Sequence, residues 1–510
     1  MRESPLIEWL LTLAHWSRRT PCGTPLNRRL FDDLREAILS GRIGPGARLP
    51  ASRDLARELR VARNTVIYAY DRLTAEGYAR ASSGSGTYVS DTAPDASLID
   101  RTVSASRTTN DWITCKGSRL AARAMDLLVN AGASDYQVGA FVPGIPDIGE
   151  FPRVVWQRLI AKVWRTAGQG QLGYGSRHGY PPLKRALAEY LTLARGVACL
   201  PEQIIVTQGS HQAIDLCARL LADPGELVWI EDPCYWGARS VFRGAGLDLE
   251  AIPVDAQGIQ LPVAFGRSPR LIFVTPSHQY PSGVVMSLAR RRLLTEMARA
   301  QGAWIIEDDY DSEFRYYGAP VPSLQGLDPH RNTIYIGSFS KVLYPGLRLA
   351  FLIVPPDLVD AFAVAQSEVY RGGQLTIQAA LAEFIDNGHY SAHVRRMRKI
   401  YAARNTLLTT SLRQHLGDRI DVAGTDTGLH LTVALHGAND HLVSQEALAQ
   451  GIVARPLSSY FAVPSNARNG LVLGYGGVSD DAIEGAVRKL AIAIDAAETS
   501  GRCAQETTLI

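Results

Sequence analysis

The sequence has few cysteines and none of the spacings that bind metals or form redox pairs. Its six cysteines are spread over 510 residues, and no two of them form a Cys-x-x-Cys motif. This argues against a zinc ribbon and against a thioredoxin-like redox site. Because isolated thiols in so long a chain are typical of a reducing compartment, we expect a cytoplasmic protein.

Long hydrophobic segments are also missing. No uninterrupted apolar run reaches the roughly 20 residues that span a bilayer. The N-terminal stretch LIEWLLTLA is apolar, but Glu8 interrupts it and no small-residue cleavage site follows. We therefore expect neither a membrane-spanning helix nor a secretory signal peptide.

Lysine is absent from the first 90 residues, although this part of the chain is basic. Residues 1–90 contain 14 arginines and 9 acidic residues, a formal charge of +5. The net charge of the whole chain is +3, which leaves −2 for the other 420 residues. A basic segment attached to a slightly acidic body indicates contact with nucleic acid. The length predicts two or three domains.

The basic segment has the pattern of three short helices followed by a hairpin. Apolar residues recur at helical spacing over residues 26–40, and residues 52–58 and 63–76 predict two further helices. The stretch GYARASSGSGTYVS predicts two short strands around a Gly/Ser tip. This order of elements is that of a winged helix-turn-helix.

The third predicted helix begins with residues that can read DNA. Arg63, Asn64 and Thr65 stand at its N-terminus, from which side chains reach bases and phosphates in a major groove. Arginine can pair with guanine and asparagine with adenine. Tyr68 lies on the outward face, and Arg53 in the preceding helix can hold a phosphate. We expect these five residues to bind DNA; for any one of them alone, an ordinary solvated side chain is the alternative.

The stretch GRIGPGARLPASRDLARELRVARNTVIYAYDRLTAEGYARASSGSGTYV resembles the GntR-type winged helix, and the resemblance covers residues 26–90. Two positions depart from that family's pattern. Ala51 replaces the usual N-cap serine, which costs about 1 kcal/mol unless Ser52 takes over the cap. Ala62 replaces the serine before the recognition arginine. Neither departure removes a charge that we expect to contact DNA.

The rest of the chain predicts a linker and then an α/β domain. Residues 1–25 form an N-terminal segment, and residues 91–135 are rich in Ser, Thr, Asp and Ala, which predicts a solvated linker. Over residues 136–495, β-branched runs alternate with helical patterns, which predicts a mostly parallel sheet with helices on both faces. From about residue 390 we expect a long helix and a smaller α+β lobe. Residues 496–510 are predicted to be a frayed tail.

The segment GSFSKVLYPGLRLAF places Lys341 between two strand-like runs. A lysine amine that reacts with a carbonyl group is the usual attachment point of pyridoxal 5′-phosphate (PLP). This cofactor also needs a carboxylate at its pyridine nitrogen and a stacking partner for its ring. Its phosphate needs a helix N-terminus, hydroxyl groups and a cation.

Each of these groups follows a predicted strand, at the edge where open α/β sheets bind ligands. Asp308 suits the pyridine nitrogen, Tyr310 can reach the ring hydroxyl, and Tyr235 can stack on the ring. The residues that suit the phosphate are Gly209, Ser210, His211, Ser338 and Arg348. Each signal alone has an ordinary explanation, such as a turn, a helix cap or a surface charge. Their joint occurrence in this order predicts a PLP site.

The motifs EDPCYWG, TPSHQYPSG, EDDYDSEFRY and SFSKVLYPGLRL are similar to those of the fold-type I aminotransferases. With the GntR-type winged helix, the chain resembles the MocR subfamily of bacterial transcription regulators. The resemblance implies a PLP aldimine on Lys341, and a homodimer in which Tyr174 reaches the partner's phosphate. It also implies a DNA-binding regulator on paired half-sites, which senses an amine, an amino acid or PLP itself.

One departure from the aminotransferase pattern lies near the ring of the expected cofactor. Aminotransferases generally carry an asparagine just before the Pro-Thr/Ser-Gly turn, and Tyr280 stands there in this chain. We expect His278 or Gln279 to contact the ring oxygen instead.

A second departure concerns the ligand. In GLVLGYGG, Val472 stands where aminotransferases often place the arginine that holds the substrate carboxylate. Arg455 and Arg468 are nearby in sequence and are candidates to replace it. We therefore expect a sensor rather than an enzyme. A working aminotransferase that carries a DNA-binding module is the alternative, and a DNA-binding protein with an inactive cofactor site is a third possibility.

Overall fold

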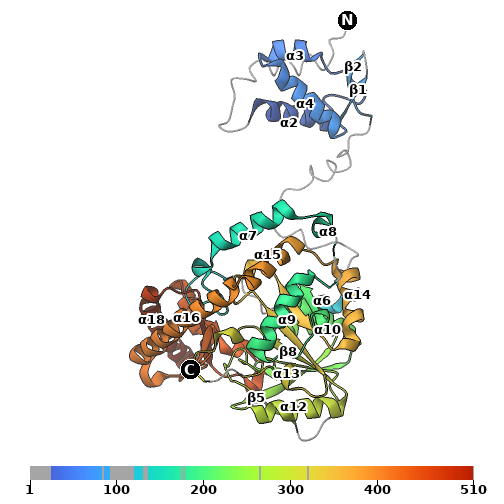
Figure 1. Ribbon diagram of the computed structural model, residues 1–510. Coiled ribbons are helices and arrows are strands. Elements are labelled where there is room, and N and C mark those ends of the chain that lie inside the picture. Colours follow the sequence, from blue (N-terminus) through green and yellow to red (C-terminus); the bar gives the residue numbers. More distant parts are fainter. Residues whose placement is uncertain are drawn as a thin grey trace. The chain divides into compact units, whose positions relative to one another are not determined.

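The computed structural model describes residues 25–82, 85–91, 120–129, 136–173, 175, 178–262, 266–318 and 321–508. Almost all of the predicted N-terminal segment, much of the predicted linker and Tyr174 lie outside these residues. The chain divides into two compact units, residues 1–119 and 120–510, and each is described by itself (Figure 1).

The first unit forms the winged helix-turn-helix that the sequence predicts. Its helices are α2 (Leu26–Leu39), α3 (Ser52–Leu59) and α4 (Arg63–Ala75), and its strands β1 (Ala79–Ser82) and β2 (Gly86–Val89) pair antiparallel. The apolar faces of the helices are buried in one core, to which Leu30, Leu55 and Val66 belong. The polar side of α4 is therefore left at the surface.

Helices α3 and α4 begin without a side-chain cap. Their N-cap residues are Ala51 and Ala62, and neither offers a side-chain acceptor to the first turn. Ser52 does not take over the cap of α3, and its hydroxyl oxygen accepts a hydrogen bond of 3.3 Å from Nε of Arg63. The hydrogen bond instead ties the start of α3 to the start of α4.

Within the described residues, the large unit is built around an eight-stranded sheet with the order β3-β10-β9-β8-β7-β4-β5-β6. Strands β9, β8, β7, β4 and β5 are parallel, while β10 runs antiparallel to β3 and β9. The strands are β3 (Ile204–Thr207), β4 (Leu227–Asp232), β5 (Asp248–Asp255), β6 (Gly258–Ile259), β7 (Leu271–Val274), β8 (Trp304–Asp309), β9 (Thr333–Ser338) and β10 (Ala350–Ile353). The predicted mostly parallel sheet is confirmed.

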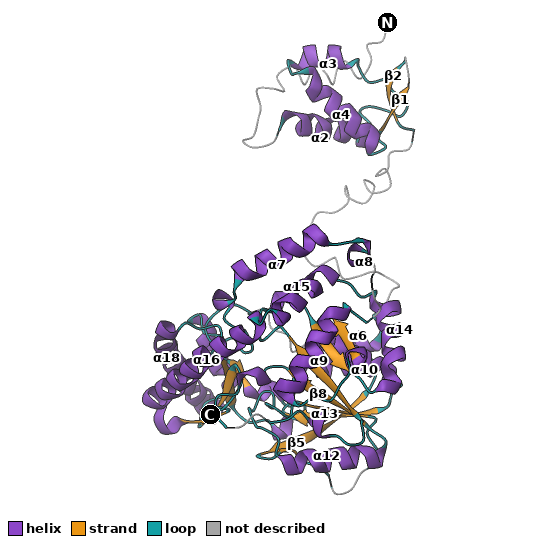
Figure 2. Cartoon of the chain, in the orientation of Figure 1, coloured by secondary structure: helices purple, strands orange, loops and turns teal. Residues whose placement is uncertain are grey.

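Helices cover both faces of this sheet (Figure 2). Because successive side chains of a strand point to opposite faces, each strand contributes to two separate cores. Ile205 belongs to the core that α10, α11 and α14 also line, whereas Ile204 belongs to the core that α7, α9 and α15 line. The helices are α7 (Arg153–Thr166), α8 (Gln169–Leu172), α9 (Pro181–Arg195), α10 (Ser210–Leu221), α11 (Trp236–Gly244), α12 (Leu288–Gln301), α13 (Leu324–Leu327), α14 (Val359–Tyr370) and α15 (Leu375–Asp386).

The C-terminal part forms the predicted smaller α+β lobe. It begins with the long helix α16 (His389–Leu416) and contains an antiparallel sheet with the order β11-β12-β14-β13. The remaining elements are β11 (Ile420–Ala423), β12 (His430–Leu435), α17 (Asp440–Ala449), β13 (Arg455–Pro456), β14 (Gly470–Gly474) and α18 (Asp480–Thr508). None of the described helices is long and apolar enough to cross a bilayer.

Two segments differ from the sequence-based expectation. Helix α6 (Ala122–Val129) forms inside the segment predicted as linker, where the Asp126 carboxylate lies 3.8 Å from the Arg243 guanidinium of α11. This contact is tertiary, so the local composition does not reveal it. At the other end, α18 continues to Thr508 through the predicted tail, which contains no proline to end a helix.

Candidate cofactor site

A pocket lies at the carboxyl ends of the strands of the large sheet. Asp308 stands near the end of β8, Ser338 ends β9, and Tyr235 follows β4. Residues that the sequence analysis assigned to one cofactor line this pocket together: Ser210, His211, Tyr235, Asp308, Tyr310, Ser338, Lys341 and Arg348. Gly209 directly precedes Ser210 as the N-cap of α10. The structure therefore brings together residues that are up to 139 positions apart (Gly209 to Arg348).

Lys341 faces this pocket with an unpaired amine. Within the part of the chain that the structure describes, its Nζ atom has no hydrogen bond or ion pair. Burial lowers the pKa of the Lys341 amine, and the Arg455 cation acts in the same direction against the Asp311 and Asp308 carboxylates. A lowered pKa enlarges the neutral fraction, which is the nucleophilic form of an amine.

Gly144 makes room for the lysine side chain. A Cβ atom at Gly144 would lie only 2.8 Å from Nζ of Lys341, and the φ angle of 72° there also favours glycine. No motif in the sequence pointed to this residue. Its role depends on a chain segment that precedes Lys341 by almost 200 positions, and only the fold brings the two together.

Asp308 offers a carboxylate to the same pocket. Its Oδ1 atom is buried and has no hydrogen-bond partner among the residues that the structure describes. Burial raises the pKa of Asp308 to about 7, and the negative charge of Asp309 adds to the effect. A buried acceptor without a partner is unfavourable unless a donor or a cation reaches it. A protonated pyridine nitrogen is such a donor.

An anion cradle lies at the start of α10. Gly209 has a φ angle of 108°, and a Cβ atom at this position would lie 3.2 Å from Nη2 of Arg348. The backbone N–H groups of the first turn of a helix, a nearby guanidinium and the hydroxyls of Ser210 and Ser338 are the groups that bind phosphate. The arrangement fits a phosphate monoester.

Two aromatic rings form one wall of the pocket. The rings of His211 and Tyr235 are nearly parallel, with centroids 5.8 Å apart and an angle of 23° between the planes. The Tyr235 hydroxyl lies 3.2 Å from Nε2 of His211. Burial lowers the pKa of His211, and the cations Arg348 and Lys341 act in the same direction. A neutral imidazole and a phenol therefore stand beside the place of a cofactor ring.

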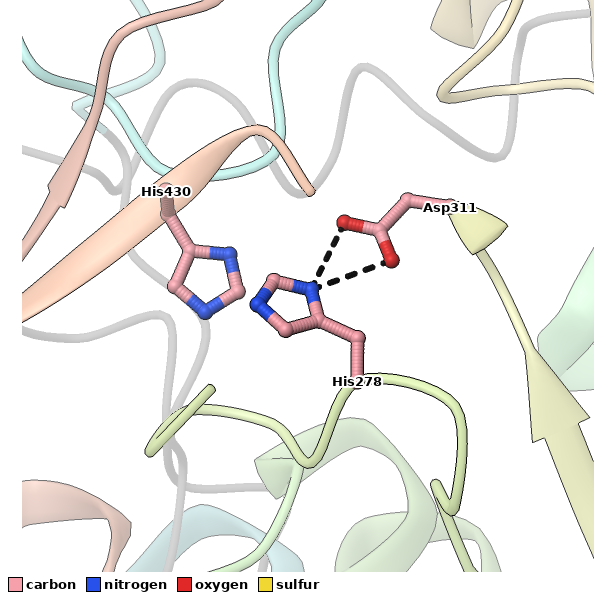
Figure 3. A group of neighbouring side chains, drawn as sticks. All are labelled: His278, Asp311 and His430. Atoms are coloured by element: carbon pink, nitrogen blue, oxygen red, sulfur yellow. Dashed lines mark hydrogen bonds and ion pairs between the residues drawn. The ribbon is translucent and has the colours of Figure 1, made fainter. Parts of the chain in front are cut away.

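A buried polar network of His278, Asp311 and His430 lies next to Tyr310, and Figure 3 shows these three side chains. The Tyr310 hydroxyl donates a hydrogen bond of 2.9 Å to the carbonyl oxygen of His278 and lies 3.1 Å from its Nδ1. The same Nδ1 lies 3.0 Å from the Asp311 carboxylate. His430 packs against the His278 ring with a centroid distance of 4.7 Å. The network fixes the Tyr310 ring at the pocket wall.

The structure does not support the expected replacements for the missing asparagine. Tyr280 itself lines the pocket, whereas His278 and Gln279 are absent from its lining. The Gln279 amide donates to the carbonyl oxygen of Pro233 at 2.8 Å, and its carbonyl accepts from the Ser282 hydroxyl. Gln279 is thus committed to the turn, and His278 acts through Tyr310.

Tyr280 and Val472, the two departures from the aminotransferase pattern, meet in one apolar cluster. Val472 is fully buried and packs in a group with Leu457 and Tyr460, against which Tyr280 is also packed. The hydroxyls of Tyr280 and Tyr460 lie 3.1 Å apart. An aromatic and apolar cluster therefore fills the place where aminotransferases carry an asparagine and an arginine.

The two candidate replacements for the missing arginine lie in different environments. Arg455 lines the pocket, whereas Arg468 is exposed and is not part of the lining. The pocket is also lined by residues that no sequence motif indicated, among them Gln137 and Ile145. Their positions depend on the packing of loops, which the sequence alone does not show.

The expected DNA-contacting residues lie on the surface of the first unit. Arg63, Asn64 and Thr65 form the first turn of α4, and Arg53 lies in the first turn of α3. Arg53, Arg63, Asn64 and Tyr68 are exposed, and Thr65 is half-buried. No hydrogen bond of the structure tests their contact with DNA, so these five assignments remain predictions.

Two protein families match the chain, each over one part of it. Residues 26–89 match the bacterial regulatory proteins of the gntR family, and residues 147–489 match the aminotransferases of class I and II. Among solved structures, a multiple substrate aminotransferase from Thermococcus profundus is 26% identical, with a TM-score of 0.66 over 75% of this chain and 96% of that one. LysN, an α-aminoadipate aminotransferase from Thermus thermophilus, is 27% identical, with a TM-score of 0.65 over 74% and 95%.

Several relatives that match both parts at once are regulators. The probable rhizopine catabolism regulatory protein MocR of Rhizobium meliloti is 40% identical, over 94% of this chain and 95% of that protein. The transcriptional regulator TauR of Rhodobacter capsulatus is 32% identical over 92% and 96%. The pyridoxine biosynthesis regulator PdxR of Corynebacterium glutamicum is 29% identical over 92% and 96%. The order of the two parts is thus the same along nearly the whole length of these proteins.

Proposed function

The chain belongs to the MocR subfamily of GntR-type transcriptional regulators, and from this premise we propose that its large unit binds PLP at Lys341 and senses a small ligand there. The ligand would be an amine, an amino acid or PLP itself. One observation carries the proposal. The Lys341 amine and the Asp308 carboxylate line the same pocket, and neither the Lys341 Nζ atom nor the Asp308 Oδ1 atom has a hydrogen-bond partner among the described residues.

The residues of this chain fit PLP on each side of the molecule. Lys341 would hold the aldehyde carbon, Asp308 the pyridine nitrogen, and Tyr235 the face of the ring. The start of α10 with Arg348 would hold the phosphate. When bound, PLP supplies an aldehyde that amines attack and a ring that withdraws electrons. A cofactor in place would also satisfy the unpartnered Oδ1 of Asp308.

The chain's own residues prepare this site for an amine. Burial keeps part of the Lys341 amine neutral, and the aromatic wall of His211 and Tyr235 excludes water from one side. The Tyr310 hydroxyl donates its proton to the His278 carbonyl, so its oxygen is left as an acceptor at the pocket wall. A ligand amine would compete with Lys341 for the aldehyde carbon of PLP. Whether Lys341 is attached to PLP or released from it would then be the signal.

Ligand binding can regulate transcription only if it favours one arrangement of the protein over another. We propose a cytoplasmic homodimer in which two winged helices bind paired half-sites, with Tyr174 reaching the partner's phosphate site. Exposed apolar side chains on α7 and α8 support an interface there, since Val154, Trp164 and Leu172 are each more than half exposed. The segment between the two units would carry the change.

A working aminotransferase remains the second candidate, because the pocket holds the lysine, carboxylate and anion cradle that such enzymes need. The cluster of Tyr280 and Val472 argues against it. Steady-state transamination with a panel of amino donors separates the two. Sustained turnover, together with promoter output that does not change in Lys341→Ala, would reject the sensor.

The direct test is chemical trapping in the full-length protein. After incubation with PLP, borohydride reduction is expected to fix the cofactor on the peptide that contains Lys341, as seen by mass spectrometry. Lys341→Ala should lose the adduct and the absorbance band of the bound cofactor. Lys399→Ala, which changes an exposed lysine of α16, should keep both. An unmodified Lys341 in the reduced wild-type protein would overturn the proposal.

A further inference from the structure

Arg455 and Val472 are direct neighbours across a strand pair. In the antiparallel ladder of β13 and β14, Arg455 is the partner of Val472. Residues that face each other in such a ladder project their side chains to the same face of the sheet. The chain therefore carries an arginine on the same face as the position where aminotransferases often have theirs, but from the adjacent strand.

The Arg455 guanidinium is available to a ligand. It lines the pocket together with Lys341 and Tyr280. Among the described residues it forms no ion pair, and its hydrogen bond is a long one of 3.4 Å from Nη2 to the carbonyl oxygen of Tyr136. An arginine at a pocket wall without an acidic partner attracts an anion, because its charge is otherwise compensated only by water.

The pocket thus contains two cationic groups besides Lys341, and they serve different places. Arg348 lies against Gly209 at the start of α10, where the phosphate of the cofactor would be held. Arg455 comes from the C-terminal lobe and also borders a neighbouring hollow lined by Tyr136, Trp236 and Tyr460. The phosphate of the cofactor would pair with Arg348, and the cofactor has no second anionic group to pair with Arg455.

The position that an arginine at 472 would serve is closed in this chain. Val472 is buried under Leu457 and Tyr460, and the hydroxyl of Tyr280 is paired with that of Tyr460. An acidic group cannot be stabilised inside this apolar cluster, since a buried charge needs a partner. The acidic group of a ligand would therefore be held further out, at Arg455.

We propose that Arg455 binds the carboxylate of the sensed ligand, and that this ligand is an amino acid rather than a simple amine or PLP alone. The inference rests on the proposed function, because the amine of the ligand is taken to bind at the PLP site. It names the substrate class that the sequence left open. Arg455 acts as a specificity-determining residue, whereas the position for which Lys341 and the ligand amine compete accepts any amine that fits.

The test compares acids with matched amines on the PLP-loaded, full-length protein. The acidic probes are alanine, β-alanine and 4-aminobutyrate. Ethylamine is the matched amine without the carboxylate for alanine and for β-alanine, and propylamine is the matched amine for 4-aminobutyrate. Affinity is read from the change in absorbance of the bound cofactor. We expect at least one acid to bind ten- to hundredfold more tightly than its amine, the range of a charged hydrogen bond.

The variants assign this preference to one residue. Arg455→Met should reduce the preference to near unity while PLP still loads, and Arg455→Lys should keep part of the preference. Arg468→Met removes an exposed arginine of the same lobe and should retain the full preference. No preference in the wild type, or an unchanged preference in Arg455→Met, would overturn the inference while leaving the PLP site in place. Failure of PLP to load would overturn both proposals.

Discussion

Arg195 and Asp309 form a buried ion pair, with Nε of Arg195 donating a hydrogen bond of 2.9 Å to Oδ2 of Asp309. The hydroxyls of Tyr335 and Ser312 donate to the same oxygen. Although burial acts in the opposite direction, the Arg195 cation and these hydrogen bonds hold the pKa of Asp309 below its ordinary value. Asp309 is thus committed to the interior, and its neighbour Asp308, on the other face of the strand, is left for the pocket.

Removal of Arg195 should destabilise the large unit strongly. Arg195→Met leaves the Asp309 carboxylate buried without its cation, and breaking a buried pair in this way costs about 3–5 kcal/mol. Denaturant unfolding of the full-length protein measures the loss. Arg219→Met, which breaks the partly exposed pair with Asp215, should cost about 1 kcal/mol or less. Equal losses in the two variants would show that the buried pair is not structural.

Asp308→Asn should make the cofactor-free protein more stable at high pH. Because the pKa of Asp308 is raised from 3.8 to about 7 in the fold, the folded state binds more protons than the unfolded state between these values. Stability is therefore lost as pH rises through 7, by an amount on the order of 4 kcal/mol. The variant lacks this loss.

The measurement is the difference in melting temperature between Asp308→Asn and the wild type. We expect it to favour the variant at pH 8 and to shrink toward pH 5. Glu231 also has a pKa raised to about 7 by burial, but this contribution is common to both proteins and cancels in the difference. With PLP present the order should reverse, since only the wild type can pair with the pyridine nitrogen. A difference that does not vary with pH would contradict the assignment.

Gly209→Ala should weaken PLP binding by tenfold or more. The φ angle of 108° is one that alanine adopts only with strain, and the new methyl group would press on the Arg348 guanidinium. Absorbance titration with PLP measures the affinity. Gly485→Ala is the matched control, because a methyl group there meets nothing within 4 Å and lies in helix α18. If Gly209→Ala bound PLP with wild-type affinity, the start of α10 would not be the phosphate site.

Local patterns in the sequence predicted the elements that carry the site. The run WIIED forms β8, and TIYIGS forms β9, so that Asp308 and Ser338 arrive at one edge of the sheet as expected. Hydrophobic runs and turn residues favour a strand or a helix over a few neighbouring positions, so they can be recognised without knowledge of the tertiary contacts. The winged helix was predictable for the same reason.

The parts that the sequence did not predict depend on contacts between distant segments. Gly144 lies against Lys341, and Arg455 faces the pocket because β13 pairs with β14. Tyr280 and Val472 also meet in one apolar cluster, although they are far apart in the sequence. None of these relationships has a local pattern, since each combines segments separated by tens to hundreds of residues.

Ala51→Ser should stabilise helix α3. The first turn of this helix has no side-chain acceptor, and a serine at the N-cap contributes about 1 kcal/mol relative to alanine. Hydrogen exchange of the α3 amides in the full-length protein is expected to slow by up to about fivefold, as about 1 kcal/mol requires. The α10 amides in the other unit serve as an internal control. Faster exchange in α3 would show that another group already caps it.

Arg63→Ala should weaken DNA binding and relax its sequence preference. Arg63 is exposed in the first turn of α4, where its only described hydrogen bond is the long one to Ser52. Loss of a base-reading arginine costs about 1–3 kcal/mol on the specific site and less on unrelated DNA. Arg42→Ala, which removes an exposed arginine that pairs with Glu36 after α2, should change both affinities little.

The salt dependence of binding separates base reading by Arg63 from a phosphate contact. If Arg63 reads a base, the ratio of specific to non-specific affinity falls in Arg63→Ala, while the slope of log affinity against log salt changes little. A phosphate contact would instead lower both affinities together and reduce the slope by about 1. Unchanged binding of Arg63→Ala to the specific site would mean that the N-terminal turn of α4 contacts solvent rather than DNA. The recognition surface would then lie elsewhere on the first unit.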